Sequence, residues 1–207
     1  MVDHRPRRRQ PARSRFEPSF ATAIESADAI LSKHISAVEL LNFTFRRVDQ
    51  YNPAINAIVC QFRDEAIARA RQADEALARG KQWGPLHGVP VTIKEAFAYQ
   101  GSPNTWGLPP LKDVKSPRTA VAVERLESAG AIVIGKTNVP VMLGDYQSGN
   151  AIYGTTNNPW DVRRTPGGST GGGAAANPCS PASTSSTMGE RAWEAQSCRL
   201  GSGSAGV

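Results

Sequence analysis

Two short apolar runs with a helix-like segment between them constrain the fold of this 207-residue chain most strongly. Val89–Ile93 and Ala131–Ile134 are predominantly apolar, which is typical of strands buried on both faces of a sheet. Between them, Thr119–Ala129 carries apolar residues at helical spacing and is followed by Gly130. A strand, a helix and a strand in this order predict parallel strands joined by a right-handed crossover, and therefore an α/β fold.

Three helices are predicted ahead of this unit. Phe20–His34 has apolar residues at helical spacing, and Ser36–Glu39 is a capping box that begins a second helix. We expect the second helix to end near Tyr51–Pro53 and Ile55–Val59 to form a short strand. Alanine-rich Glu65–Arg79 is the third helix. The N-terminal helices are expected to cover one face of the sheet.

The positive charge of the chain is concentrated at its N-terminus. The formal net charge is +6, and residues 1–15 hold six arginines and one aspartate, which leaves +1 for the rest. We interpret residues 1–18 as a disordered basic tail, which lacks the apolar stretch of a secretory signal. A nucleic-acid-binding arm is the alternative, but the nearly neutral body argues against a nucleic-acid partner. No apolar run is long enough to predict a membrane span.

The cysteines give no sign of a disulfide framework or a zinc site. Cys60, Cys179 and Cys198 are odd in number and irregularly spaced, without a Cys-x-x-Cys pair or a nearby histidine cluster. This pattern favours a reducing, cytoplasmic location and predicts no bound metal.

One segment imitates a phosphate-binding loop. Gly130–Thr137 has two glycines in P-loop spacing followed by Lys-Thr. A phosphate loop requires a strand before the first glycine and a helix at the lysine, whereas here a predicted helix precedes Gly130 and a predicted strand occupies the loop. Apolar residues in that place cannot readily provide a cradle of backbone amides. We therefore interpret the segment as a buried strand.

The glycine-rich stretch Thr165–Ala176 holds Ser169 between pairs of glycines, 75 residues after Lys94. Lys94 ends a predicted buried strand, and a buried lysine can act as a general base once it is neutral. Such a lysine and such a serine suggest nucleophilic or proton-relay chemistry without histidine. Two structural alternatives remain: Lys94 extends to water or pairs with Glu95, and the glycine-rich stretch is a flexible linker.

Four blocks in order carry a resemblance to a known family. They are Gly84–Glu95, Gly130–Pro140, Tyr153–Asp161 and Arg164–Gly172. Their sequences and spacing resemble the amidase signature family over about residues 20–176. The resemblance implies a partial amidase signature domain at 19–176, with a mixed sheet flanked by helices that is incomplete at its C-terminus.

The resemblance also implies a chemistry. The family hydrolyses carbon–nitrogen bonds of amides with a Ser-cis-Ser-Lys triad and without a cofactor, so a small-molecule amide is the expected substrate. Lys94 would be the base, and Ser169, preceded by a cis peptide bond, the bridging serine. A second serine would be the nucleophile. The residues expected to bind substrate or shape the loop are Gly167, Gly168, Thr170 and Gly171.

The chain departs from the family pattern after the glycine-rich stretch. The family usually has a serine where Thr170 stands, which keeps the hydroxyl. The nucleophile is expected about two dozen residues beyond Ser169, in a Gly-Gly-Ser element that supplies oxyanion-binding amides. No Gly-Gly-Ser follows Ala176, and the candidate Ser197 is preceded by Gln196 instead of glycine. We therefore expect catalysis to be impaired, with a non-catalytic, amidase-derived binding or interaction protein as the alternative.

Residues 177–207 show neither periodicity nor the family pattern. We expect a disordered tail outside the family domain. A shifted reading frame or a misjoined exon would produce such a change, and the nucleotide sequence beyond the Ala176 codon tests this hypothesis.

Overall fold

The two apolar runs pair as parallel strands at the centre of the fold. In the computed structural model, which describes residues 16–176, they form β2, Pro90–Lys94, and β3, Ile132–Thr137. β1, Ile58–Gln61, pairs antiparallel with the other edge of β3, three residues later than the predicted Ile55–Val59. The mixed sheet, in the order β1-β3-β2, confirms the predicted α/β fold.

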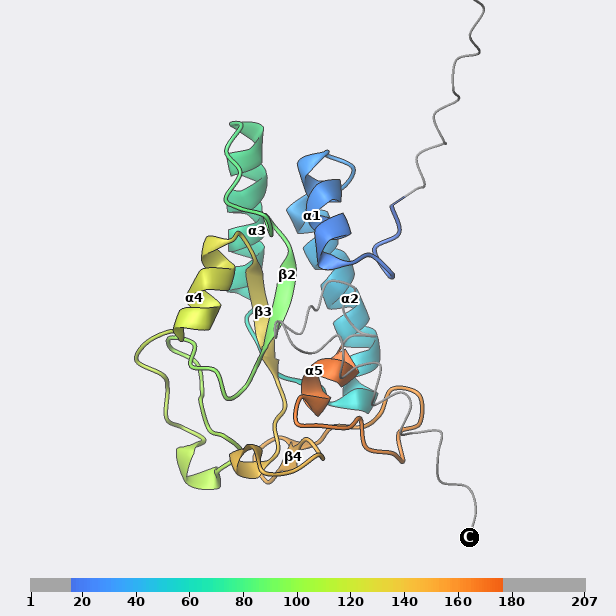
Figure 1. The fold of residues 1–207 in the computed structure, drawn as a ribbon, viewed down its shortest axis with the longest axis vertical. Helices are drawn as coiled ribbons and strands as arrows, with labels where there is room; N and C mark the ends of the chain where they lie inside the picture. The colour runs from blue at the N-terminus through green and yellow to red at the C-terminus, as the bar shows by residue number, and fades with distance from the viewer. Residues whose placement is uncertain (1–15, 177–207) are drawn as a thin grey trace, which may run out of the picture.

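Five α-helices lie around this sheet in the described part of the chain (Figure 1). They are α1 Ala23–Leu31, α2 Ala37–Ile55, α3 Arg63–Ala78, α4 Val121–Ser128 and α5 Gly171–Ala176. Two 3₁₀ turns, η1 Pro109–Leu111 and η2 Val141–Leu143, and a small hairpin of β4 Gly149–Asn150 and β5 Gly154–Thr155 complete the elements.

Alternate residues of β3 belong to two different apolar clusters. Ile132 and Ile134 pack with α2 and α3, whereas Val133 packs in a cluster with α4 and with Ala23 and Ala27 of α1. Successive side chains of a strand point to opposite faces, so the two clusters cover the two sides of the sheet. The expectation that all the N-terminal helices share one face holds for α2 and α3 and is wrong for α1.

α2 runs further than its sequence predicts. It continues through Pro53 to Ile55, because the proline lies in the last turn and removes only one intrahelical hydrogen bond. The helix ends where Asn56 adopts a left-handed conformation, with φ of 54°. Asn52 fixes this end, since its carbonyl accepts the Asn56 N–H at 2.7 Å and its side chain accepts the Ala57 N–H at 2.9 Å.

The start of α2 is held by two carboxylates. The predicted capping box forms: the Glu39 N–H donates to Ser36 Oγ at 3.1 Å and the Ser36 N–H donates to Glu39 Oε2 at 2.8 Å. From α3, Asp74 accepts the N–H groups of Ala37, at 2.7 Å, and Val38, at 3.1 Å. The first N–H groups of a helix have no partner within the helix, so Asp74 both caps α2 and ties it to α3.

The glycine-rich stretch is closely packed and does not behave as a flexible linker. A Cβ atom on Gly172 would lie 2.4 Å from the carbonyl oxygen of Asn138, and one on Gly168 would lie 2.4 Å from that of Tyr146. The Gly172 N–H donates to Ser148 Oγ at 3.1 Å. Only glycine permits these backbone approaches. The stretch is therefore held against the segment that follows β3.

We expect Asp74→Ala to lower the free energy of unfolding by about 1–2 kcal/mol, because two N–H groups at the start of α2 lose their acceptor. Urea denaturation followed by circular dichroism measures the change. Glu75→Ala is the matched control, since Glu75 is exposed and only pairs with Arg79 at 3.8 Å. Equal stability of Asp74→Ala and wild type would show that the cap does not stabilise the fold.

We expect Gly172→Ala to lower the free energy of unfolding by about 1–3 kcal/mol, because the new methyl group meets fixed backbone atoms of Asn138. Gly144→Ala is the control, since its Cβ would lie 3.6 Å from the nearest atom, the Val141 carbonyl oxygen. Thermal denaturation of both variants makes the comparison. Equal effects of the two substitutions would contradict the packing described above.

Candidate active site

Lys94 and Ser169 meet at the carboxyl ends of the two parallel strands. Lys94, the last residue of β2, is half-buried and lies opposite Thr137 of β3 in the register. α5 contacts β2 and β3 and lies beside their lower ends in Figure 1, so the segment just before it reaches Lys94. Lys94 Nζ donates to the Ser169 carbonyl oxygen and lies 3.4 Å from Ser169 Oγ. The fold thus joins the two residues that the sequence singles out.

The glycines around Ser169 shape the backbone there. Gly167 has φ of 83°, and its N–H donates to Thr165 Oγ1 at 3.1 Å. The peptide bond between Gly168 and Ser169 is cis. Gly168 is buried against the Tyr146 backbone, whereas Ser169 is exposed. The hydroxyl of Ser169 therefore faces open space on a backbone that is fixed from behind.

Thr170 and Gly171 connect Ser169 to α5. Thr170 is half-buried, and its carbonyl accepts the Ala174 N–H at 2.9 Å, within the first turn of the helix. Gly171 is buried, and a Cβ atom there would lie 2.9 Å from Ser148 Oγ. Both residues thus hold the serine loop on the helix and on the segment after β3.

Glu95, directly after Lys94, is fully buried. Its Oε1 accepts the N–H of Thr105 at 2.6 Å and the hydroxyl of Tyr153 at 3.3 Å, and its Oε2 accepts the N–H of Trp106 at 3.1 Å. Burial, the largest contribution, raises the pKa of Tyr153 to about 12, so this phenol remains a hydrogen-bond donor at neutral pH.

Lys136 is a second lysine at the same edge of the sheet. It is fully buried in β3, and its Nζ donates to the Pro103 carbonyl oxygen and to Ser102 Oγ, the latter at 3.2 Å. Burial lowers the pKa of Lys136 to about 8, and the charge of Glu95 opposes that shift. Since β3 occupies the apolar part of Gly130–Thr137, that segment is a strand, as its sequence context predicts, and not a phosphate loop.

Sequence reasoning missed the polar residues that support the site from behind. Asn138 Nδ2 donates to the Gly154 carbonyl oxygen and to Thr156 Oγ1, both at 3.0 Å, and Asn138 Oδ1 accepts from Asn150 Nδ2 at 3.0 Å. Asn138 is fully buried, and it ties β3 to the small hairpin. A polar residue directly after a buried strand is the signal that would have identified it.

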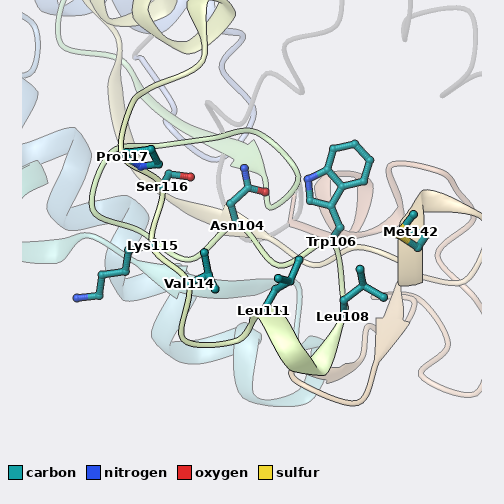
Figure 2. A pocket seen from close by; sticks show the side chains of 9 residues that line it. All are labelled: Asn104, Trp106, Leu108, Leu111, Val114, Lys115, Ser116, Pro117 and Met142. Atoms are coloured by element: carbon teal, nitrogen blue, oxygen red, sulfur yellow. The ribbon is translucent and has the colours of Figure 1, made fainter.

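A hollow of about 420 Å³ lies on the loops beside this edge (Figure 2). Trp106 and Met142 lie at one end, Val114 lies toward the other, and the Met142 N–H donates to the Trp106 carbonyl at 2.8 Å. The remaining lining residues are Asn104, Leu108, Leu111, Lys115, Ser116 and Pro117. Neither Lys94 nor Ser169 lines the hollow, so it is separate from the lysine–serine pair.

Other site predictions concern residues on which the structure bears only in part. Cys60 is a free thiol whose pKa is raised by burial. Between residues 16 and 176, no group of three or more His, Cys, Asp or Glu side chains could hold a metal ion, and no helix there has the length and apolarity needed to cross a membrane. Ser197, Cys179, Cys198 and the predicted tails at 1–15 and 177–207 lie outside the described residues.

Comparison with known proteins places this geometry in a family. The family model described as Amidase matches residues 39–183. The indoleacetamide hydrolase of Bradyrhizobium diazoefficiens is 44% identical over 155 residues, which are 75% of this chain and 30% of that protein. The glutamyl-tRNA(Gln) amidotransferase of Acidothermus cellulolyticus has one component that is 38% identical over 155 residues, 75% of this chain and 31% of that component.

A solved structure agrees with these relatives. The crystal structure of a bacterial aryl acylamidase of the amidase signature family superposes with a TM-score of 0.73 and 30% identity, over 76% of this chain and 33% of that one. The chain spans about a third of the length of the relatives that it matches. The family model covers more than half of the chain, and the chain therefore belongs to the amidase family.

Proposed function

We propose that this chain carries the lysine and the bridging serine of an amide-hydrolysing Ser-cis-Ser-Lys site, with Lys94 as the base and Ser169 as the bridge. The contact of Lys94 Nζ with Ser169 Oγ at 3.4 Å is the observation that supports it most directly. Hydrogen bonds between catalytic groups are often long in the absence of substrate and tighten in the complex. The family membership gives independent support for hydrolase chemistry.

The proposed relay moves one proton through Ser169. The neutral amine of Lys94 accepts the proton of Ser169 Oγ, and Ser169 Oγ accepts the proton of a nucleophilic serine as that serine attacks the amide carbonyl. The relay then returns the proton to the leaving nitrogen, which departs as an amine or ammonia. Gly167, Gly168, Thr170 and Gly171 would hold the bridging hydroxyl in place on its loop.

The nucleophile itself limits what the chain does. The sequence after Ala176 contains no Gly-Gly-Ser, and the candidate Ser197 lacks the preceding glycine. Because members of a catalytic unit act together, loss of one lowers turnover by orders of magnitude. We therefore propose that the 207-residue chain is catalytically impaired. A non-catalytic, amidase-derived binding or interaction protein is the second candidate, and the same missing element favours it.

The proposed ligand is a small-molecule amide, and no nucleic acid is expected. The names of the relatives, an indoleacetamide hydrolase and a glutamyl-tRNA(Gln) amidotransferase, support amide-type chemistry while differing in substrate. We propose a cytoplasmic location, which the free thiol of Cys60 favours. Fractionation of the source cells tests the location, and recovery of the protein outside the cytoplasm would contradict it.

A chimera tests the roles of Lys94 and Ser169 separately from the nucleophile. Residues 20–176 replace the matching part of the Bradyrhizobium diazoefficiens indoleacetamide hydrolase, to which the chain is 44% identical. We expect the chimera to release ammonia from indoleacetamide, and Lys94→Ala or Ser169→Ala to lower its kcat by about 1,000-fold or more.

Lys33→Ala is the control for the chimera, because Lys33 is exposed at the end of α1, and its kcat should equal that of the chimera. An active chimera that keeps its turnover after Lys94→Ala would refute the assignment of the base. One that keeps its turnover after Ser169→Ala would refute the bridge.

The unmodified 207-residue chain tests the impairment. We expect little or no release of amine or ammonia from aliphatic, aryl and fatty acyl amides or from glutamine, because no recognisable oxyanion-binding element follows Ser169. Turnover that Lys94→Ala abolishes would contradict the impairment and support the site. A folded, inactive chain that binds one of these amides in calorimetry would favour the second candidate.

A further inference from the structure

The segment Ser102–Gly107 crosses the edge of the site between two buried charges. On one side, the Lys136 ammonium donates to the Pro103 carbonyl oxygen and to Ser102 Oγ. On the other side, the Glu95 carboxylate accepts the N–H groups of Thr105 and Trp106. A carbonyl thus faces the cation and two N–H groups face the anion, which is the favourable orientation of a peptide segment between opposite charges.

The two charges depend on this segment because both side chains are fully buried. A buried charge is costly unless a counter-charge and hydrogen bonds compensate it. Within residues 16–176, the recorded bonds of Glu95 and Lys136 run to Ser102–Trp106 and Tyr153, and none joins the two side chains directly. The segment therefore mediates their attraction, and removing either charge leaves the other uncompensated.

This arrangement also fixes the strand end that carries Lys94. The Glu95 N–H donates to the Thr137 carbonyl at 2.9 Å, which extends the β2–β3 ladder by one residue past Lys94. Lys136 immediately precedes Thr137. The backbone of Lys94 is consequently held between a residue anchored through its carboxylate and a neighbouring strand anchored through its ammonium.

The same segment reaches the other partner of the relay. The Trp106 carbonyl accepts the Met142 N–H at 2.8 Å, in the turn η2. Four residues after Met142, the backbone of Tyr146 is in contact with Gly168, the residue before Ser169. A change at the segment would therefore be transmitted to both sides of the Lys94–Ser169 contact.

We propose that Glu95 is a positioning residue for Lys94 and that Lys136 balances its charge through the Ser102–Gly107 segment. The significance for catalysis rests on the function proposed above. The geometry itself does not, since it concerns where the Lys94 amine lies, and that can be measured without turnover.

The test compares the 207-residue chain with Glu95→Gln, Lys136→Met and the double variant. Amide hydrogen exchange reports on the N–H groups of Thr105 and Trp106, and acetylation by a small active ester, read by mass spectrometry, reports on Lys94 relative to exposed Lys33. Glu127→Gln is the matched control, because the Glu127 carboxylate accepts the Tyr99 hydroxyl at 3.1 Å and does not touch the segment.

We expect Glu95→Gln to speed exchange of the Thr105 and Trp106 amides about tenfold or more, since both lose a charged acceptor. Lys94, released from Ser169, should be acetylated about threefold faster or more relative to Lys33, as expected for residues coupled through one network. The double variant should lie closer to wild type than the product of the single effects, because it leaves no unpaired charge. Glu127→Gln should change neither reading.

Faster exchange at Thr105 and Trp106 with unchanged acetylation of Lys94 would overturn the proposal, since Glu95 would then only stabilise the loop. If Glu95→Gln does not fold, Tyr153→Phe removes a single bond to Glu95 while keeping the charge, and an unchanged Lys94 reactivity there would overturn the proposal equally. A confirmed shift of Lys94 reactivity beside an inactive chimera would leave the positioning intact and refute only the proposed function.

Discussion

The rest of the site depends on the contact between the backbones of Gly172 and Asn138. Asn138 directly follows β3, and no side chain fits at position 172, where a Cβ would lie 2.4 Å from the Asn138 carbonyl oxygen. This contact seats the start of α5 on the end of the sheet. Because Ser169 lies three residues earlier, the same contact brings its hydroxyl to Lys94, 75 residues away in the chain. Close packing, and not flexibility, explains the glycines.

Local patterns predicted much of the fold. The strand–helix–strand order gave the parallel pair, and Ser36 gave the start of α2. The end of α2 could not be read from Pro53, because Asn52 and Asn56 set it through bonds to the following residues. The position of α1 was also missed, since helical spacing identifies an apolar side of a helix but not the face of the sheet that it covers.

The candidate site divides in the same way. Lys94 and Ser169 were found because a lysine at the end of a buried strand and a serine among glycines are visible in the sequence, and the family resemblance paired them. Glu95 and Lys136 were not recognised as partners of one segment, because their burial and bonds arise only when distant loops meet. Lys136 was considered only within a misleading P-loop pattern. Buried charges bridged by backbone leave no mark on periodicity or spacing.

The central claim is that the fold holds the Lys94 amine beside the Ser169 hydroxyl. A crystal structure of the 207-residue chain would measure this most directly, through the distance between Lys94 Nζ and Ser169 Oγ. The account predicts a separation close to 3.4 Å, with Gly172 against Asn138. A folded chain in which the two atoms lie more than about 5 Å apart, beyond the range of a hydrogen bond, would contradict it.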